Sequence, residues 1–162
     1  MKLTRRQWLG TILVMTGTAL AAVDVSVVGT AMPTIIGELG GLDRYGWVFS
    51  AYLLTSTATT PVFGRLADMF GRKPLYFGAL VGFVAASMLA GTSRSMDELI
   101  FYRALQGIGA GALLPTGFTM IADLFDCVTR AKMAGLFGTV WIGSAIVGPA
   151  IGGGITQAFS WR

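Results

Sequence analysis

The sequence contains no histidine, and Cys127 is the only cysteine among its 162 residues. The missing imidazole removes the commonest acid–base group and the commonest metal ligand, and a lone cysteine excludes an internal disulfide. Charged residues make up 12% of the chain, where a soluble domain has roughly 25%. The net charge of +4 is scattered and forms no patch for nucleic acid. Without a nucleophile–base pair either, the sequence predicts no enzyme, no metal site and no cofactor.

What the chain does contain is apolar sequence, since 54% of its residues are hydrophobic. A helix needs about 20 residues to cross a bilayer, and five apolar runs reach or approach that length. They lie at residues 9–32, 45–64, 75–93, 99–122 and 133–158. The sequence therefore predicts an all-α, polytopic membrane protein with about five transmembrane helices.

Lysine and arginine are distributed unequally between the two ends of the predicted helices. Eight of them lie in the N-terminal segment and in the connectors 65–73 and 123–132, whereas the opposite side has only Arg44, Arg94 and Arg162. Because short cytoplasmic loops are enriched in positive charge, we expect the N-terminus to lie in the cytoplasm.

Two short motifs are typical of other functions but occur in the wrong context. "TRRQWLG" before an apolar run is similar to a twin-arginine export signal with cleavage after Ala21, yet four more membrane-length runs follow it. An exported protein stays a remote alternative. "GIGAGA" at 107–112 matches a loose dinucleotide-binding fingerprint, but it lies inside an apolar run rather than in a βαβ unit. Small residues there favour close helix packing.

The second connector reads "GRLADMFGRKPLY" and resembles the loop motif between helices two and three of the major facilitator superfamily. The residues that carry the match include Gly64, Asp68, Gly71, Arg72 and Lys73, while Met69 departs from the family's usual basic residue. Glycines permit a tight turn, and Pro74 suits the first turn of the next helix. The resemblance implies that Arg72 approaches an acid at the inner end of the fourth span, with Asp123 the first candidate and Asp126 the second.

Two further motifs support the same resemblance. The fourth span matches the family's fourth-helix motif at Leu99, Arg103, Gln106, Gly107, Gly109, Ala110 and Gly111. The fifth span resembles the motif of the antiporter branches at Gly143, Gly148, Pro149, Gly152 and Gly153. Ser144, Gly148 and Gly152 are spaced by four and share one helix face, which predicts close approach of a neighbouring helix. Pro149 favours a kink.

The first span carries "VDVSVVGTAMPTI", which resembles the first-helix signature of the EmrB/QacA-type, fourteen-span proton antiporters. Asp24, Ala31 and Pro33 match, and Ser26 replaces a threonine. The resemblance implies proton-coupled efflux of amphipathic organic compounds, such as drugs or dyes, across a bacterial inner membrane. The expected partners are the small-molecule substrate, protons and membrane lipid. A facilitator exporter of siderophores or other metabolites, or a symporter, is the alternative.

Asp24 is an ionisable residue within a membrane span, which is costly and marks a candidate functional site. It lies about 22 Å from the inner end of its span and Arg103 about 6 Å from the outer end of the fourth, so both fall in the outer half. By resemblance the two helices line one cavity, and we expect Asp24, Arg103 and Gln106 to serve proton coupling or substrate binding. The alternatives are an early end of the first span, leaving Asp24 among headgroups, and an Arg103 that snorkels outward.

The second span is polar for a membrane helix, with "YLLTSTATTP" in its middle. Tyr52, Ser56 and Thr59 fall on one helix face, where they line a wet cavity or, in the alternative, bond back to their own helix. Facilitators resemble two six-helix bundles with the substrate site between them. We expect this chain to be an N-terminal fragment that ends before the sixth helix and lacks the C-terminal half.

Overall fold

The computed structural model describes residues 4–158 and 161, which form five α-helices and contain no strand. The helices are α1 (Arg5–Leu39), α2 (Tyr45–Phe70), α3 (Arg72–Gly91), α4 (Met96–Leu124) and α5 (Cys127–Ala158). The prediction of an all-α fold is confirmed.

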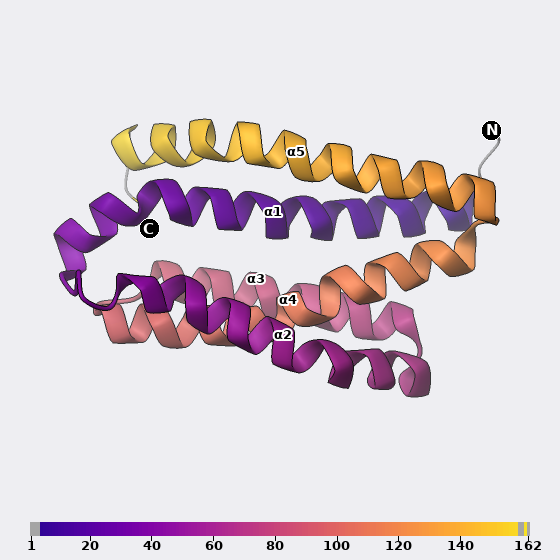
Figure 1. The fold of residues 1–162 in the computed structure, drawn as a ribbon, viewed down its shortest axis with the longest axis horizontal. Coiled ribbons are helices and arrows are strands. Elements are labelled where there is room, and N and C mark those ends of the chain that lie inside the picture. The colour runs from indigo at the N-terminus through magenta and orange to yellow at the C-terminus, as the bar shows by residue number, and fades with distance from the viewer. Residues whose placement is uncertain (1–3, 159–160, 162) are drawn as a thin grey trace.

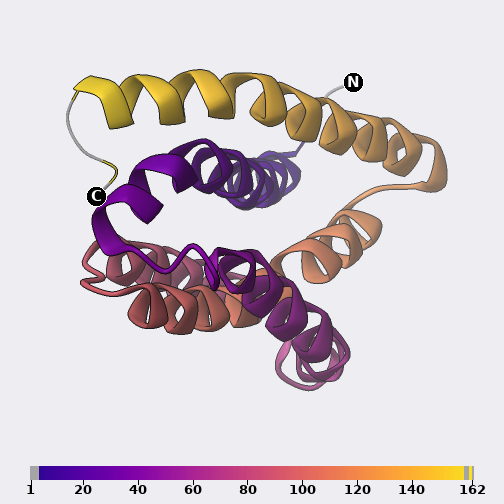
Figure 2. The same cartoon turned by 60° about the vertical axis from the view of Figure 1, so that its left-hand side comes forward.

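The five helices run back and forth along the long axis of the molecule (Figure 1). α1 and α5 lie side by side in one layer, and α2, α3 and α4 form the other (Figures 1 and 2). The start of the chain and the α2–α3 and α4–α5 turns are at one end, which we call the inner end. The α1–α2 and α3–α4 connectors are at the opposite, outer end. Alternate connectors therefore share an end, as the charge count requires.

Local sequence explains where the helices begin and end. Thr4 and Gln7 form a capping box at the start of α1, and the Ser95 side chain accepts the backbone N–H of Glu98 at the start of α4. Gly40 (φ 68°) follows α1, and Gly71 (φ 91°) alone separates α2 from α3. Both backbones take left-handed conformations that glycine adopts without strain.

Four of the five predicted apolar runs lie within a helix, and the third, 75–93, continues two residues past the end of α3 at Gly91. α1, α3, α4 and the described part of α5 are long and apolar enough to cross a membrane. α2 has 26 residues but is not among these four, because serine and threonine interrupt its apolar sequence. The extent of each span within a bilayer therefore stays a prediction.

The expectation that residues 65–73 form a connector is wrong in detail. α2 continues to Phe70, so Gly64 and Asp68 lie in its last turns and only Gly71 makes the turn. A helix bonds its backbone internally, so it continues past the apolar boundary until a residue such as glycine ends it. Pro74 lies in the first turn of α3, as predicted.

α4 is the central helix, since it packs against each of the other four. Two apolar clusters form around it, one toward the inner end with Val14, Tyr76 and Leu113, and one toward the outer end with Ile35 and Leu99. On α1 the interval between the residues of the two clusters contains Asp24, and on α4 it contains Arg103 and Gln106. The candidate site occupies this interval.

Candidate functional site

Asp24, Arg103 and Gln106 form a closed hydrogen-bonded network between α1 and α4. Arg103 Nη1 lies 2.6 Å from Asp24 Oδ2 and donates a second hydrogen bond of 2.6 Å to Gln106 Oε1. Gln106 Nε2 donates to Asp24 Oδ1 at 2.7 Å. Both carboxylate oxygens of Asp24 are therefore bonded, one to a cation and one to a neutral amide.

Three helices position this network. Arg103 and Gln106 are three residues apart on α4 and share a face, which α1 meets at Asp24. From α2, the ring of Tyr52 lies against the guanidinium, with 4.4 Å between the Arg103 Cζ atom and the ring centroid. This cation–π contact fixes the plane of the guanidinium. Sequence reasoning placed Tyr52 on a cavity-facing surface and missed the contact, because nothing in the spacing links α2 to Arg103.

The network is buried but borders a cavity. The side chain of Arg103 is 1% exposed and that of Asp24 is 12% exposed. A cavity of about 760 Å³ between α1, α3 and α4 is lined by Asp24, Arg103 and Gln106 together with apolar side chains such as Val27 and Phe83. A buried ion pair repays its desolvation only with good geometry and extra hydrogen bonds, and the Gln106 amide supplies two of these.

The remaining donors of Arg103 are less well satisfied. Its Nε and Nη2 atoms are buried without a hydrogen-bond partner among the described residues. Unpaired buried donors cost about 1–3 kcal/mol each.

The structure brings together the residues whose predicted depths matched. Asp24 lies within the helical part of α1, 15 residues before its end at Leu39, and not beyond the end of the helix. Arg103 points inward, so the snorkelling alternative is excluded by its 1% exposure.

Ser56 and Thr59 lie on the side of α2 that faces α4, where a side chain at Gly111 would meet both residues. Their hydroxyls bond back to α2, from Ser56 to the Leu53 carbonyl at 3.0 Å and from Thr59 to the Thr55 carbonyl at 2.7 Å. The cavity beside Asp24 is lined from α1, α3 and α4 instead. Both hydroxyls thus make the local hydrogen bonds that were the alternative to cavity lining.

At the inner end, Arg72 joins three helices. Its guanidinium lies 2.5 Å from Asp123 and 3.6 Å from Asp68, and it donates to the Thr119 carbonyl at 3.0 Å. Exposed pairs of this kind contribute under about 1 kcal/mol each. The start of α3 is nevertheless tied to the ends of α2 and α4 by one side chain.

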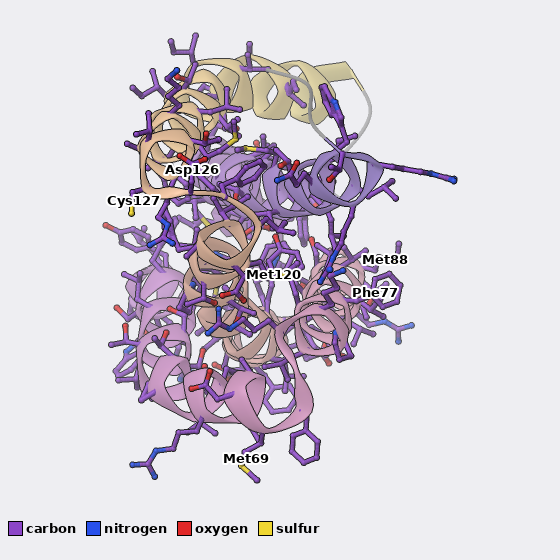
Figure 3. All side chains as sticks on the ribbon, turned by 90° about the vertical axis from the view of Figure 1, so that its right-hand side faces the viewer. Met69, Phe77, Met88, Met120, Asp126 and Cys127 are labelled. Carbon is purple, nitrogen blue, oxygen red and sulfur yellow. The ribbon has the colours of Figure 1, made fainter. Side chains whose placement is uncertain are left out.

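Asp126, the second candidate partner of Arg72, has another role. It lies in the α4–α5 turn (Figure 3) and accepts hydrogen bonds from the backbone N–H groups of Val128 and Thr129. This is the pattern of a helix N-terminal cap. Hydrogen bonds from Thr129 lower the pKa of the Asp126 carboxyl below its ordinary value. Asp123 is thus the acid that pairs with Arg72.

The glycine motif of α5 meets α1. A side chain at Gly148 would collide with Ser26, and one at Gly152 would collide with Thr30 and approach the Val27 backbone. Ser144, on the same face, is 7% exposed. The predicted close approach along this face is confirmed.

The other residues of this motif lie away from the α1–α5 contact. A Cβ at Gly143 or Gly153 would meet nothing within 4 Å, and Pro149 lies inside the helix. On α4, by contrast, Gly107, Gly109 and Gly111 all contact backbone atoms of α2 or α3. The "GIGAGA" segment is therefore a packing surface, as its apolar context predicted.

Comparison with known proteins relates this chain to membrane transporters. It is 46% identical over 154 residues to the multidrug transporter protein MdtP and 43% identical over 146 residues to multidrug resistance protein 3, both of Bacillus subtilis. It is 36% identical over 157 residues to the acurin A biosynthesis cluster MFS-type transporter of Aspergillus aculeatus. These alignments cover 93%, 90% and 97% of this chain. The chain spans about 28% of the length of each relative.

The family itself follows from a separate match. The sequence profile of the Major Facilitator Superfamily matches residues 14–162, nearly the whole chain. Together with the long apolar helices, this match indicates a multi-pass membrane protein of a transporter family. The chain belongs to the Major Facilitator Superfamily.

Proposed function

We propose that the intact protein exports amphipathic organic compounds, such as drugs or dyes, in exchange for protons. The observation that carries this proposal is the Asp24–Arg103–Gln106 network, an ionisable group held within a membrane bundle at the edge of a cavity. Such residues are rare in membranes and commonly serve proton or ion movement. The names of the two Bacillus relatives, a multidrug transporter and a multidrug resistance protein, support the substrate class.

The geometry supports a mechanism in which Asp24 exchanges a proton for substrate. Arg103 and Gln106 hold the Asp24 carboxylate at the edge of the cavity. Protonation would weaken the hydrogen bond from Arg103 and release a guanidinium that already has two unpaired donors. The proposal further assigns the α1–α5 glycine contact to a helix that slides during the change of access.

The second candidate is export of a metabolite by the same mechanism, or symport. The acurin A relative favours it, because its printed name refers to a biosynthetic cluster. Dye accumulation by everted vesicles that contain the intact protein distinguishes drug export from metabolite export. We expect an imposed pH gradient to drive uphill dye movement and a protonophore to stop it.

The proposal gives Arg72 a conformational role at the inner end. Arg72→Ala removes the ties to Asp123, Asp68 and the Thr119 carbonyl, so the helices lose one preferred arrangement. We expect dye efflux to fall about five-fold or more, which corresponds to a coupling free energy of about 1 kcal/mol. Membrane insertion should be retained. Arg65→Ala is the matched control, since Arg65 is exposed at the same end. Equal efflux by the two variants would show that the charges of this loop set only the orientation of the protein in the membrane.

We propose that the inner end faces the cytoplasm of a bacterium, which places the N-terminus inside. Two exposed residues at opposite ends of the bundle test this, Leu42 and Met69. In a Cys127→Ser background, we expect an impermeant thiol reagent to label Leu42→Cys on intact cells and Met69→Cys only after permeabilisation. The reverse pattern would invert the orientation.

A further inference from the structure

A groove at the inner end lies between the first turns of α1 and α3. It is a cavity of about 450 Å³ that is lined by Arg5, Arg6 and Lys73 and by the apolar or small residues Leu9, Gly10, Leu13 and Met120. We call it the α1–α3 groove. Met120 is seen near the middle of this end of the bundle (Figure 3). Three cations therefore border an apolar floor.

The three cations form no ion pair with the described residues. Among residues 4–158 and 161, no carboxylate lies within salt-bridge distance of Arg5, Arg6 or Lys73, and all three are exposed. An adjoining cavity of about 520 Å³ shares Arg6 and Lys73 and also contains Asp68, Arg72 and Asp123. Both acids there are already engaged by Arg72. The junction of the two cavities thus has unbalanced positive charge.

The shape of the groove selects among anions. A free phosphate would need the cations but not the floor of Leu9, Leu13 and Met120. A molecule with a phosphate at one end and a hydrocarbon chain at the other would use both. Trp8, next to the groove on α1, is 54% exposed, and tryptophan is enriched where a membrane meets water.

We propose that the α1–α3 groove binds an anionic phospholipid. Its phosphate lies between Arg6 and Lys73, with Arg5 at the rim, and one acyl chain follows Leu9 and Met120. Basic pockets between membrane helices bind lipid headgroups in this way, and each Lys or Arg near an anionic membrane surface strengthens binding. The site is separate from the Asp24 network, since none of its residues belongs to that network.

Lipid retention by the intact protein in detergent, measured by native mass spectrometry, tests the site. Phosphatidylglycerol should bind more tightly than phosphatidylcholine with the same acyl chains. Arg6→Gln combined with Lys73→Gln should weaken phosphatidylglycerol binding about 30-fold, which is the loss of two surface cations. Arg65→Gln combined with Lys132→Gln removes the same charge from exposed positions outside the groove, and should leave binding unchanged.

A second pair of measurements separates lipid from free phosphate and does not depend on the charge variants folding. Leu9→Trp fills the floor while retaining every cation, and should also weaken phosphatidylglycerol binding. Soluble glycerol 3-phosphate should not displace the lipid. Equal binding of the two lipids, an equal loss in both double variants, or displacement by glycerol 3-phosphate would each overturn the proposal.

Discussion

Asp24→Asn is expected to reduce gradient-driven dye efflux by the intact protein to the level of vesicles that lack it. Asparagine retains the shape of the side chain and a carbonyl that can accept from Gln106, but it has no carboxylate to bind and release a proton. Downhill exchange of dye needs no proton movement and should survive. The measurement is dye movement with and without an imposed gradient, at external pH 6 to 8.

Folding needs its own control, because the Asp24→Asn substitution leaves the buried Arg103 cation without its charged partner. Breaking a buried pair in this way costs about 3–5 kcal/mol. Asp24→Asn combined with Arg103→Gln removes both charges and should insert while remaining uncoupled. Asp43→Asn removes an exposed acid from the outer connector and should pump normally. If Asp24→Asn pumps like the wild type across the pH range, Asp24 is structural and the proton assignment fails.

The meeting of Asp24 with Arg103 could be predicted from two premises, their equal depth and a family resemblance that places the first and fourth helices at one cavity. In a membrane bundle the helices are nearly parallel, so counting residues from each end gives depth directly. Two polar residues at equal depth in an apolar environment have few other partners. The actual distance of 2.6 Å and the closure of the network through Gln106 depend on helix rotation, which residue counting does not fix.

The contacts that could not be predicted are those set by rotation about the helix axes or by turn geometry. Tyr52 was predicted to line a wet cavity with Ser56 and Thr59, but packing places its ring against the Arg103 guanidinium instead. Gly64 was expected to help form a turn, yet α2 has no reason to stop before Gly71. Asp123, the first candidate partner of Arg72, does pair with it, whereas the capping role of Asp126 was not predicted.

α4 packs closely against α2 at Gly107, beside the backbone of Tyr52. A substitution at Gly107 should therefore affect both the stability of the fold and the candidate site. A methyl group at Gly107 would overlap the Tyr52 carbonyl and the Thr55 side chain. The carbonyl belongs to a helix backbone and does not move freely, so α2 must shift. We expect Gly107→Ala to lower the free energy of unfolding by about 1–3 kcal/mol, as overpacking does. The fall in thermal midpoint can be followed by size-exclusion after heating.

Two matched glycine variants make this expectation specific. Gly82→Ala on α3 meets nothing within 4 Å and should be neutral or stabilising, since alanine is favoured over glycine in a helix by about 1 kcal/mol. Gly111→Ala meets the Ser56 backbone one turn further along and should destabilise as Gly107→Ala does.

Only Gly107→Ala displaces Tyr52, whose ring lies against Arg103. Its efflux should therefore fall further than that of Gly111→Ala, because Arg103 then loses the ring that packs against it. If both variants lose thermal stability but do not differ in efflux, the α2–α4 contact supports the fold alone. In that case Tyr52 has no part in positioning the network.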